Sequence, residues 1–472
     1  MSDEVVHVAM FPSAGMGHLT PFLRLASLFL NNNCKVTLIT PLPTVSLAES
    51  QLLDHFHSCF PQVNRVPFNL PPPPPSSSIS VDPFFLRVQT LRNSTHLLPS
   101  LISSLSPPIT VFISDILLFS PLNKITQKLS LPNYILNTSS SAMFSLFSHF
   151  PTLAQSLSSQ EQEYDASDGV LVPGIPFSPL PYSSIPPFLL QPTSILRNLA
   201  MEDSPKLVYL HGVFANTFEA LESHSLEALN SGKVVKNMPP VYAVGPFVPF
   251  EFEKGQKEAS SPRSIKWLDD QPIGSVVYVC FGSRTTLGRE QMKEIGDGLM
   301  RSGYKFLWVV KDKIVDKEEE VGLDEVLGVE LVEKMKDRGL VVKEWVDQSE
   351  ILSHKSVGGF VSHCGWNSIT EAALNGVPIL GWPQHGDQKI NAKLVEISGW
   401  GVWNKSWGWG GELVVKGGEI GDAIKEMMKN ELFKVKAIEL KEEGRKAISV
   451  GGDCEVTIQK LIQKWKNNVN NI

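Results

Sequence analysis

The feature that most constrains the fold is an alternation of apolar, β-branched runs with stretches of helical spacing, which occurs twice along the chain. The first series contains HVAMF, KVTLIT, VNRVPF, TVFISDI, NYILNTS and GVFANTF, and the second contains SVVYVCFGS, KFLWVVK, GLVVKEW, VGGFVSH and VPILGW. Such runs are typical of strands buried on both faces of a parallel sheet, with a helix between successive strands. We therefore predict an α/β protein with two doubly wound, Rossmann-like domains.

The length and a polar segment between the two series predict the domain boundaries. A chain of 472 residues is too long for one ordinary core. The segment VPFEFEKGQKEASSPRS is polar and contains glycine, which favours a linker. We expect an N-terminal domain over 1–245, a linker over 246–262 and a C-terminal domain over 263–452. An amphipathic helix over 453–472 is expected to pack back on the N-terminal domain.

Composition excludes several classes of protein. The formal net charge of -7 and the scattered lysines and arginines argue against a nucleic-acid binder. The five cysteines are odd in number and include no C-x-x-C pair, so neither a disulfide framework nor a zinc site is predicted. The acidic start MSDEVV does not resemble a signal peptide, and no run reaches the ~18 apolar residues of a membrane span. We expect a cytoplasmic protein.

The turn GMGHLTP after the first predicted strand could seat a dinucleotide or present a histidine. The dinucleotide fingerprint needs a third glycine, where Thr20 stands, and an acid at the tip of the second strand, which runs into PLPTVS. NAD binding is therefore not predicted. The turn instead places His18 at a helix N-terminus, which disfavours an imidazolium and leaves a neutral ring that can act as a base.

Residues 345–388 contain a candidate anion site. The strand VGGFVSH ends at His363, and a helix follows it. The first residues of this helical segment are Gly365, Trp366, Asn367 and Ser368. A helix N-terminus with short polar side chains suits a diphosphate, although GWNS alone could be an ordinary helix cap. Ser283, at the end of VVYVCFGS, could cover the diphosphate from the other side.

Other side chains of the same segment suit a nucleoside and a sugar. Trp345 offers a flat surface for a base, while Gln348 and Glu371 can hydrogen-bond a ribose. Asp387 and Gln388 follow the next strand and suit sugar hydroxyls. An aromatic platform, an anion cradle and polar groups in one segment together predict a site for a nucleotide diphosphate sugar.

This segment resembles the signature box of the plant UDP-dependent glycosyltransferases. FPSAGMGHLTP, GVFANTFEALE, VGPF, SVVYVCFGS, HCGWNS and GDQ extend the resemblance over the whole chain in that family's order and spacing. It implies a GT-B fold with two domains facing a central cleft, an inverting mechanism, a UDP-sugar as co-substrate, and no metal or other cofactor. The chain also lacks a D-x-D of the kind that metal-dependent transferases use.

The resemblance assigns the residues of the box to parts of the donor. Uridine is expected to contact Trp345, Val346, Gln348 and Glu371. The diphosphate is expected to lie against Ser283, His363, Asn367 and Ser368, and Gly365 belongs to the same UDP-sugar site. The sugar is expected to contact Trp366, Asp387 and Gln388. Asp387 stands where the family more often has glutamate, which keeps the charge and shortens the reach.

The resemblance also gives His18 the role of general base, supported by Asp115 in VFISDIL. A carboxylate stabilises the imidazolium that forms when a histidine takes a proton. As the alternative, Asp115 is a local turn or cap residue. The proline-rich segment NLPPPPPSSSISVDPFFLR is predicted to be an extended loop. Aromatic residues on the proline-rich segments can wall an acceptor pocket, or those segments can be simple connections. The predicted wall consists of Phe84, Phe85, Tyr182 and Phe188.

A finer resemblance, through SAGMGHLTPFLRLASL, NCKVTLITPLPTVS, SVDPFFLR and PQHGDQ, is to the flavonoid C-glycosyltransferase branch. It implies transfer of glucose to an aromatic carbon of a polyhydroxylated aryl ketone, such as a dihydrochalcone or 2-hydroxyflavanone, by a monomeric enzyme. A flavonoid O-glucosyltransferase, a UDP-sugar epimerase and a non-catalytic UDP-sugar binder are the alternatives. The expected partners are UDP-glucose and the phenolic acceptor.

Overall fold

The computed structural model describes residues 5–71, 83–158, 169–249, 262–311, 322–344 and 346–469. These residues form two compact units. The first comprises Met1–Phe252 with Lys446–Ile472, and the second comprises Glu253–Arg445. The chain thus enters the first unit again at Lys446, seven residues before the predicted boundary. Most of the predicted linker, residues 250–261, and Trp345 lie outside the described residues.

The first unit is built on a parallel sheet with the strand order β3-β2-β1-β4-β5-β8-β9. Its strands are β1 (His7–Phe11), β2 (Lys35–Leu42), β3 (Asn64–Asn69), β4 (Val111–Asp115), β5 (Asn133–Asn137), β8 (Gly212–Ala215) and β9 (Val241–Ala243). A short antiparallel pair, β6 (Gly169–Val170) and β7 (Leu180–Pro181), lies outside this sheet. The strand order reverses between β1 and β4, and ligands of such sheets bind at the carboxyl ends of the strands beside this reversal.

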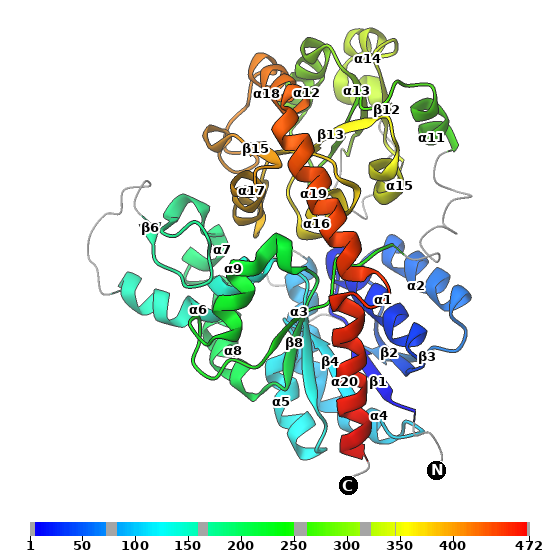
Figure 1. Ribbon diagram of the computed structural model, residues 1–472, viewed down its shortest axis with the longest axis vertical. Helices are drawn as coiled ribbons and strands as arrows, with labels where there is room; N and C mark the ends of the chain where they lie inside the picture. The colour runs from blue at the N-terminus through cyan, green and yellow to red at the C-terminus, as the bar shows by residue number, and fades with distance from the viewer. Residues whose placement is uncertain are drawn as a thin grey trace. The chain divides into compact units, whose positions relative to one another are not determined.

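Helices cover both faces of the first sheet (Figure 1). They are α1 (Met16–Asn31), α2 (Leu47–Cys59), α3 (Pro83–Ser94), α4 (Leu98–Ser103), α5 (Phe119–Lys128), α6 (Ser141–Ser158), α7 (Pro187–Leu190), α8 (Ile195–Asp203), α9 (Glu219–Asn230) and α20 (Asp453–Val469). The 3₁₀ helices are η1 (Thr95–Leu97), η2 (Tyr182–Ser184) and η3 (Ser204–Tyr209). Because side chains alternate along a strand, Val8 and Met10 of β1 pack with α1 and α20, whereas Ala9 and Phe11 pack with α3, α4 and α5.

The final helix, α20, completes the core of the first unit. Trp465 is fully buried, and its indole N–H donates to the hydroxyl of Tyr134 on β5 at 3.2 Å. The thiol of Cys454 donates to the carbonyl of Val244 at 2.8 Å. Ile458 and Leu461 are buried in the same hydrophobic cluster as α1 and α2. Residues near the end of the chain therefore belong structurally to the unit that contains its beginning.

The second unit repeats the doubly wound arrangement, with the strand order β12-β11-β10-β13-β14-β15 in a parallel sheet. Its strands are β10 (Val276–Cys280), β11 (Lys305–Val309), β12 (Gly339–Val342), β13 (Val357–Ser362), β14 (Ile379–Gly381) and β15 (Gly401–Trp403). The order reverses between β10 and β13. This second reversal predicts a second ligand site, at the ends of these two strands.

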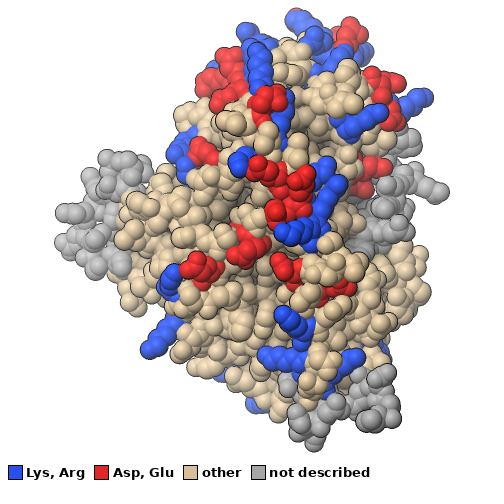
Figure 2. Space-filling model, in the orientation of Figure 1, with Lys and Arg blue, Asp and Glu red and all other residues tan. Residues whose placement is uncertain are grey.

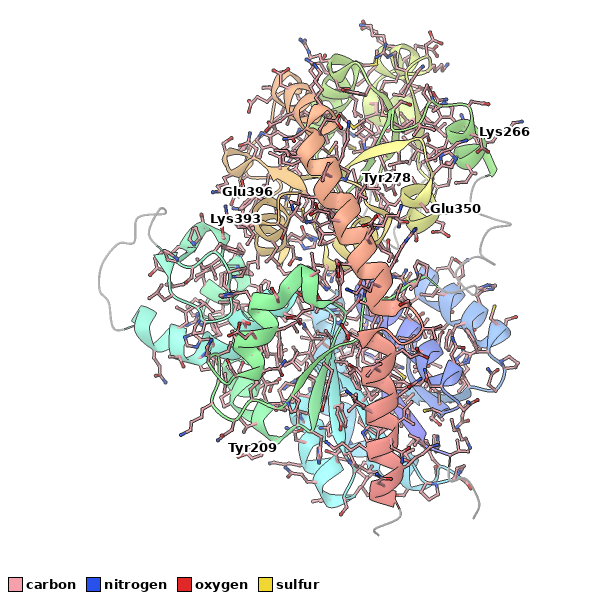
Figure 3. The ribbon with its side chains drawn as sticks, viewed as in Figure 1. Tyr209, Lys266, Tyr278, Glu350, Lys393 and Glu396 are labelled. Carbon is pink, nitrogen blue, oxygen red and sulfur yellow. The ribbon has the colours of Figure 1, made fainter. Side chains whose placement is uncertain are left out.

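The helices of the second unit pack on both faces of its sheet (Figure 1). They are α11 (Pro262–Asp269), α12 (Arg289–Ser302), α13 (Leu323–Leu327), α14 (Val329–Met335), α15 (Gln348–Ser353), α16 (Trp366–Asn375), α17 (Gln388–Ile397), α18 (Gly417–Lys429) and α19 (Glu431–Ile448), with the 3₁₀ helix η5 (Lys405–Trp407). Val277 and Val279 of β10 pack with α12 and α18. On the other face, the buried ring of Tyr278 stacks on Phe360 with ring centroids 4.9 Å apart (Figure 3).

Every run that the sequence predicted as a strand forms one, which confirms the α/β, doubly wound class. The prediction that NLPPPPPSSSISVDPFFLR is an extended loop was wrong over its last residues, because residues 83–94 form α3. Proline is favoured in the first turn of a helix, and Phe84, Val88 and Leu91 then recur at helical spacing and are buried. The residues before Pro83, 72–82, lie outside the described residues.

Charged side chains of both signs are interspersed over the face of the molecule shown in Figure 2. An example is α17, where Lys393 pairs with Glu396 one turn away (Figure 3). Among the described residues, no helix combines the length and the hydrophobicity that are needed to cross a membrane.

Candidate functional site

The turn GMGH in the first unit connects β1 to α1. Gly15 stands directly before α1 with a φ of 92°, a backbone conformation that favours glycine. Its N–H donates to Oε1 of Glu49, on α2, at 2.9 Å. The ring of Phe84 lies 3.4 Å from the position that a β-carbon at residue 15 would occupy. The turn is therefore held from two sides, and it places His18 in the first turn of α1.

His18 and Asp115 meet at the reversal of strand order. Asp115 is the last residue of β4, the neighbour of β1, and its Oδ2 lies 2.7 Å from Nδ1 of His18. The carboxylate is fully buried, whereas the histidine side chain is 23% exposed. Oδ1 of Asp115 accepts from the N–H of Leu117 at 2.9 Å. Because a carboxylate only accepts, it fixes the proton of His18 on Nδ1 and leaves the lone pair of Nε2 available as a base.

Apolar side chains surround this pair. The rings of His18 and Phe84 have centroids 5.6 Å apart, and Phe84 meets Phe85 edge to face at 5.4 Å. A buried cluster around them contains Ala14, Phe84, Val88 and Leu199. Its partly buried members are Val45, Phe85, Leu117, Ile195 and Leu196. His18 therefore lies beside an apolar wall formed by α3, α8 and the turns after β1 and β4.

The predicted acceptor residues divide into two groups. Phe84 and Phe85 lie on α3 next to His18. Tyr182 lies in η2 and Phe188 in α7, both partly buried, and neither belongs to the cluster around His18 among the described residues. Their place in an acceptor pocket stays a prediction.

In the second unit, the ring of His363 lies between two glycines. A β-carbon at Gly282, in the turn after β10, would fall 2.6 Å from Nε2 of His363, and one at Gly365 would fall 2.4 Å from it. Gly365 directly precedes α16, so the imidazole lies against the N-terminus of that helix. Side chains larger than hydrogen would displace the ring. The two glycines thus create the cradle in which His363 lies, beside the diphosphate site that the sequence predicted.

His363 is present as a neutral imidazole. Burial, followed by the charges of His385 and Lys311, lowers its pKa to about 3. Its Nδ1 is buried and has no hydrogen-bond partner among the described residues. A neutral ring can donate one hydrogen bond to an anion without the cost of burying a second charge.

A small pocket opens beside this cradle, at the ends of β10 and β11. Gly282, Thr285, Trp308 and Lys311 are among the residues that line it. Burial lowers the pKa of Lys311 from its usual value. Lys311 was not predicted as a site residue, although a cation at the carboxyl end of the strand KFLWVVK could have indicated it.

Gln348 connects two residues of α16. Its Nε2 donates to Oγ of Ser368 at 3.0 Å and to Oε2 of Glu371 at 2.8 Å. Ser368 and Glu371 are both buried, and Val346 is buried just before α15. The structure therefore brings together Gln348 and Glu371, which the sequence assigned to the nucleoside, and Ser368, which it assigned to the diphosphate.

Asp387 and Gln388 follow β14 and begin α17. The side-chain oxygen of Gln388 accepts from the backbone N–H groups of Gln384 at 2.8 Å and His385 at 3.0 Å. The turn itself therefore uses the acceptor of Gln388. Its NH₂ group lies 3.4 Å from Nδ1 of His385, and the side chain is 4% exposed, so only the second N–H of this group could reach a sugar hydroxyl. Asp387 is partly exposed at the start of α17.

The remaining predicted residues are placed as follows. Ser283 is partly exposed in the turn after β10, and Asn367 is partly exposed in the first turn of α16. Trp366 is 3% exposed, so its indole offers a sugar little surface. Trp345, the predicted platform for uracil, lies outside the described residues.

Three residues that support the sites were not predicted. Glu49 holds the turn at Gly15, and Oγ1 of Thr138 lies 3.2 Å from Nδ1 of His18. Asn391 donates from Nδ2 to the carbonyl of Cys364 at 3.0 Å and so holds the turn before α16. None of these residues stands in a motif, so only the tertiary structure reveals them.

The described residues include no group of three or more His, Cys, Asp or Glu side chains placed to hold a metal ion. The expectation that the chemistry needs no metal stays a prediction.

Comparisons with known proteins find similarity over the whole chain. The family described as UDP-glucoronosyl and UDP-glucosyl transferase matches residues 256–443. UDP-glycosyltransferase 708D1 of Glycine max is 54% identical over 474 residues, which cover 99% of this chain and 98% of that protein. UDP-glycosyltransferase CGT of Oryza sativa subsp. japonica is 42% identical over 469 residues, covering 97% and 96%. The crystal structure of LpCGTa in complex with UDP matches with a TM-score of 0.85 at 40% identity, covering 98% of this chain and 99% of that one.

Proposed function

The chain belongs to the UDP-glycosyltransferase family, and we propose that within it this enzyme transfers glucose from UDP-glucose to an aromatic carbon of a polyhydroxylated aryl ketone. Its two doubly wound units are the GT-B fold that the sequence predicted. The observation that carries the proposal is the His18–Asp115 pair at 2.7 Å beside the apolar cluster of α3 and α8. This arrangement provides a base next to a surface that suits an aromatic substrate.

The second unit supplies the donor site in this proposal. The uridine contacts Trp345, Val346 and the pair of Gln348 with Glu371. The diphosphate lies at the N-terminus of α16, where the helix dipole favours negative charge and His363 donates a hydrogen bond. Lys311 adds a positive charge at the neighbouring pocket. As UDP leaves, these groups stabilise the charge that develops on the β-phosphate.

The first unit supplies the acceptor site and the base. Nε2 of His18 takes the proton of a phenolic hydroxyl, and the carboxylate of Asp115 stabilises the imidazolium that forms. A phenolate delocalises its charge onto the ring carbon next to the oxygen. Phe84 and Phe85 contact the face of the aromatic ring, and as aromatic side chains they lose little entropy on binding.

The C–C bond forms when that ring carbon attacks the anomeric carbon from the side opposite UDP, with inversion. The C–O bond to the β-phosphate breaks, and its electron pair leaves with UDP. The attacking ring carbon then loses its hydrogen as a proton, the phenolic oxygen regains one, and the ring becomes aromatic again. The overall change is one aryl C–H and one UDP-glucose converted into one aryl C-glucoside, UDP and a proton.

Attack by the phenolate oxygen would instead give an O-glucoside. The two outcomes differ in which acceptor atom faces the anomeric carbon. Support for the C-glucoside comes from the relative named CGT and from the neighbour LpCGTa, together with the segments that resemble the flavonoid C-glycosyltransferase branch. A phloroglucinol-type ring suits this chemistry, because two hydroxyl groups flank one nucleophilic carbon.

The product made from UDP-glucose and phloretin tests the proposal. After heating in acid, a C-glucoside remains intact, and its NMR spectrum has lost one aromatic proton. Release of glucose with every ring proton retained would establish an O-glucosyltransferase instead. A control incubation with UDP-glucose alone tests the epimerase alternative, because an epimerase would change the sugar without an acceptor. A non-catalytic binder would bind UDP and form no product in either experiment.

A further inference from the structure

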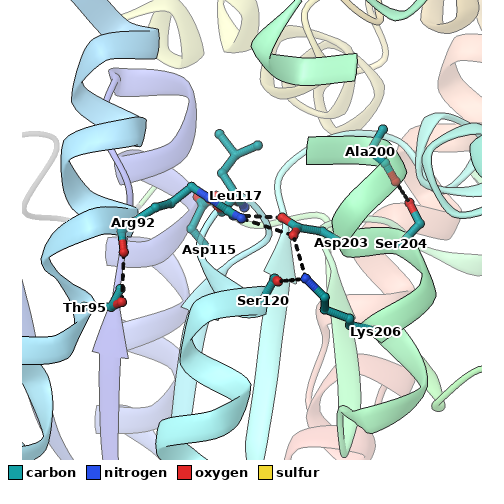
Figure 4. Close-up of polar contacts among 9 residues, drawn as sticks. All are labelled: Arg92, Thr95, Asp115, Leu117, Ser120, Ala200, Asp203, Ser204 and Lys206. Atoms are coloured by element: carbon teal, nitrogen blue, oxygen red, sulfur yellow. Dashed lines mark hydrogen bonds and ion pairs between the residues drawn. The ribbon is translucent and has the colours of Figure 1, made fainter. Parts of the chain in front are cut away.

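Arg92 and Asp203 form an ion pair next to the turn that follows Asp115. Arg92, in the last turn of α3, donates from Nη1 to Oδ2 of Asp203 at 2.8 Å and from Nη2 to Oδ1 at 3.1 Å (Figure 4). The side chain of Asp203 is 1% exposed and that of Arg92 is 14% exposed. A two-pronged contact of this kind fixes the orientation of the guanidinium as well as its position.

The same guanidinium contacts the turn beside the proposed catalytic pair. Nη1 of Arg92 also donates to the carbonyl oxygen of Leu117 at 2.6 Å. The N–H of Leu117 donates to Oδ1 of Asp115 at 2.9 Å (Figure 4). Leu117 therefore joins the buried ion pair to the carboxylate that contacts His18.

Asp203 in turn is held by its own surroundings. Nζ of Lys206 lies 3.7 Å from Oδ1 of Asp203 and donates to Oγ of Ser120, in the first turn of α5, at 2.7 Å. The hydroxyl of Ser204 bonds to the carbonyl of Ala200, one turn back in α8, at 2.6 Å (Figure 4). The ion pair thus connects α3 and α8, the helices of the apolar wall, with the turn between β4 and α5.

We propose that Arg92, held by Asp203, is a positioning residue that sets the orientation of the Asp115 carboxylate through Leu117. This inference rests on the proposed role of His18 and Asp115. A carboxylate at the end of a strand can rotate, and among the described residues Oδ1 of Asp115 accepts its hydrogen bond from the N–H of Leu117. Because Arg92 fixes the carbonyl on the other side of that residue, the turn cannot rotate without breaking a buried, charge-assisted bond. Even a small displacement of a catalytic group strongly lowers the rate of the reaction.

The first test measures kcat and KM for Arg92→Met and Arg92→Lys. We expect Arg92→Met to lower kcat about 10-fold, as a misplaced catalytic group would, with KM for UDP-glucose and the Kd for UDP unchanged. Lysine keeps a positive charge near Asp203 but cannot form the fork, so Arg92→Lys should lower kcat by a smaller factor. It also supplies a folded variant if burial of an unpaired Asp203 prevents Arg92→Met from folding.

Arg65→Met is the matched control. Arg65 forms an ion pair with Asp54 at 3.1 Å in the same unit, with both side chains well exposed. Removing an exposed pair costs little stability, so this variant should keep the kcat of the parent enzyme. Equal losses of kcat in Arg65→Met and Arg92→Met would overturn the proposal.

A double-mutant cycle with Asp115→Ala decides between positioning and general structural support. Without the carboxylate, Arg92 has nothing to orient, so Arg92→Met or Arg92→Lys should change the residual kcat of Asp115→Ala by less than about 2-fold. A purely structural role would lower kcat by the same factor in both backgrounds, and this result would overturn the inference. If Asp115→Ala and His18→Ala alone retained full kcat, the proposed dyad itself would be wrong, which is a distinguishable result.

Discussion

The imidazole of His363 occupies space that only a glycine at position 282 leaves open. A β-carbon on Gly282 would lie 2.6 Å from Nε2 of the ring, well inside the contact distance of real β-carbons. The backbone at Gly282 has a φ of 79°, so two independent constraints favour glycine there. The position of His363 therefore depends on a residue 81 positions earlier in the sequence, in the turn after the neighbouring strand β10.

Gly282→Ala should weaken UDP binding by displacing His363. Because alanine also resists positive φ, part of the effect will be backbone strain of about 1 kcal/mol. Gly274→Ala is the matched control, since Gly274 has a φ of 65° and no atom lies within 4 Å of the position that a β-carbon there would occupy. We expect both variants to lose stability and Gly282→Ala alone to bind UDP about 10-fold more weakly in calorimetric titration. Similar Kd values for the two variants would refute the steric role.

The lowered pKa of His363 predicts a pH-dependent stability. Its pKa of about 3 in the folded state lies below the usual 6.5, because burial disfavours the charged ring. Below about pH 6.5 the unfolded chain binds a proton that the folded chain does not bind, so the free energy of unfolding decreases as the pH falls toward 3.

The variant His363→Gln should lose less stability than the parent between pH 7.5 and 5. The difference should be no more than about 2 kcal/mol, which is the proton-binding free energy of a group with a pKa of 6.5 at pH 5. Urea unfolding of both proteins at the two pH values measures it. Other histidines whose pKa is lowered in the folded state, such as His57, are present in both proteins and cancel in the comparison. Identical losses in both proteins would contradict the prediction.

His18→Ala should abolish most of the transfer. Loss of a general base commonly lowers the rate by about 10²–10⁴. The donor residues lie on the second unit, so the Kd for UDP should stay within about 2-fold of the parent value. Initial rates with a phenolic acceptor and a UDP titration give the two quantities. Substantial turnover by the alanine variant would show that another group takes the proton.

Gln348→Leu should weaken binding of UDP, because the amide of Gln348 links Ser368 to Glu371. Leucine cannot donate, so Glu371 loses one hydrogen bond at a buried position, and the expected loss of affinity is about 10-fold. Gln463→Leu is the control, since Gln463 forms an exposed amide pair with Asn467 on α20. Equal Kd values for UDP in all three proteins would remove Gln348 from the nucleoside site.

Gln388 can be tested by separating its two functional groups. Gln388→Glu keeps an oxygen that accepts from the N–H groups of Gln384 and His385, but it loses the NH₂ donor. We expect a higher KM for UDP-glucose and an unchanged Kd for UDP, because the sugar and Nδ1 of His385 would miss the donor, whereas UDP would not. Gln388→Ala should also loosen the turn and lower the melting temperature. An unchanged KM in the glutamate variant would exclude the NH₂ group from sugar recognition.

The doubly wound class and its strands followed from local patterns, because a strand buried on both faces is apolar whatever it packs against. β15 was not predicted, because the strand Gly401–Trp403 is too short to show an apolar run. Residues 83–87 were assigned to a loop because the prolines before them dominated the composition, although the helical spacing of Phe84, Val88 and Leu91 was present.

The candidate site was predictable where its residues follow strands at a reversal of order. His18 and His363 could be found in this way, whereas Asp115 was assigned through the resemblance to the glycosyltransferase family. The contacts that hold them could not, because they join distant positions: Gly15 to Glu49, and Arg92 to Asp203, which is 111 residues away. A lone arginine or glutamate on an amphipathic helix has the same local pattern whether it supports a site or faces solvent.

The packing of α20 has a consequence for how the protein is made. The core that surrounds α1 includes Trp465, yet the ribosome synthesises the whole second unit before that residue. Domains usually fold in the order of their synthesis. Here the second unit can complete its own core first. The apolar surface of α1 and β5 in the first unit stays uncovered until α20 has been synthesised. During translation this surface is the part of the nascent chain that a chaperone would need to protect.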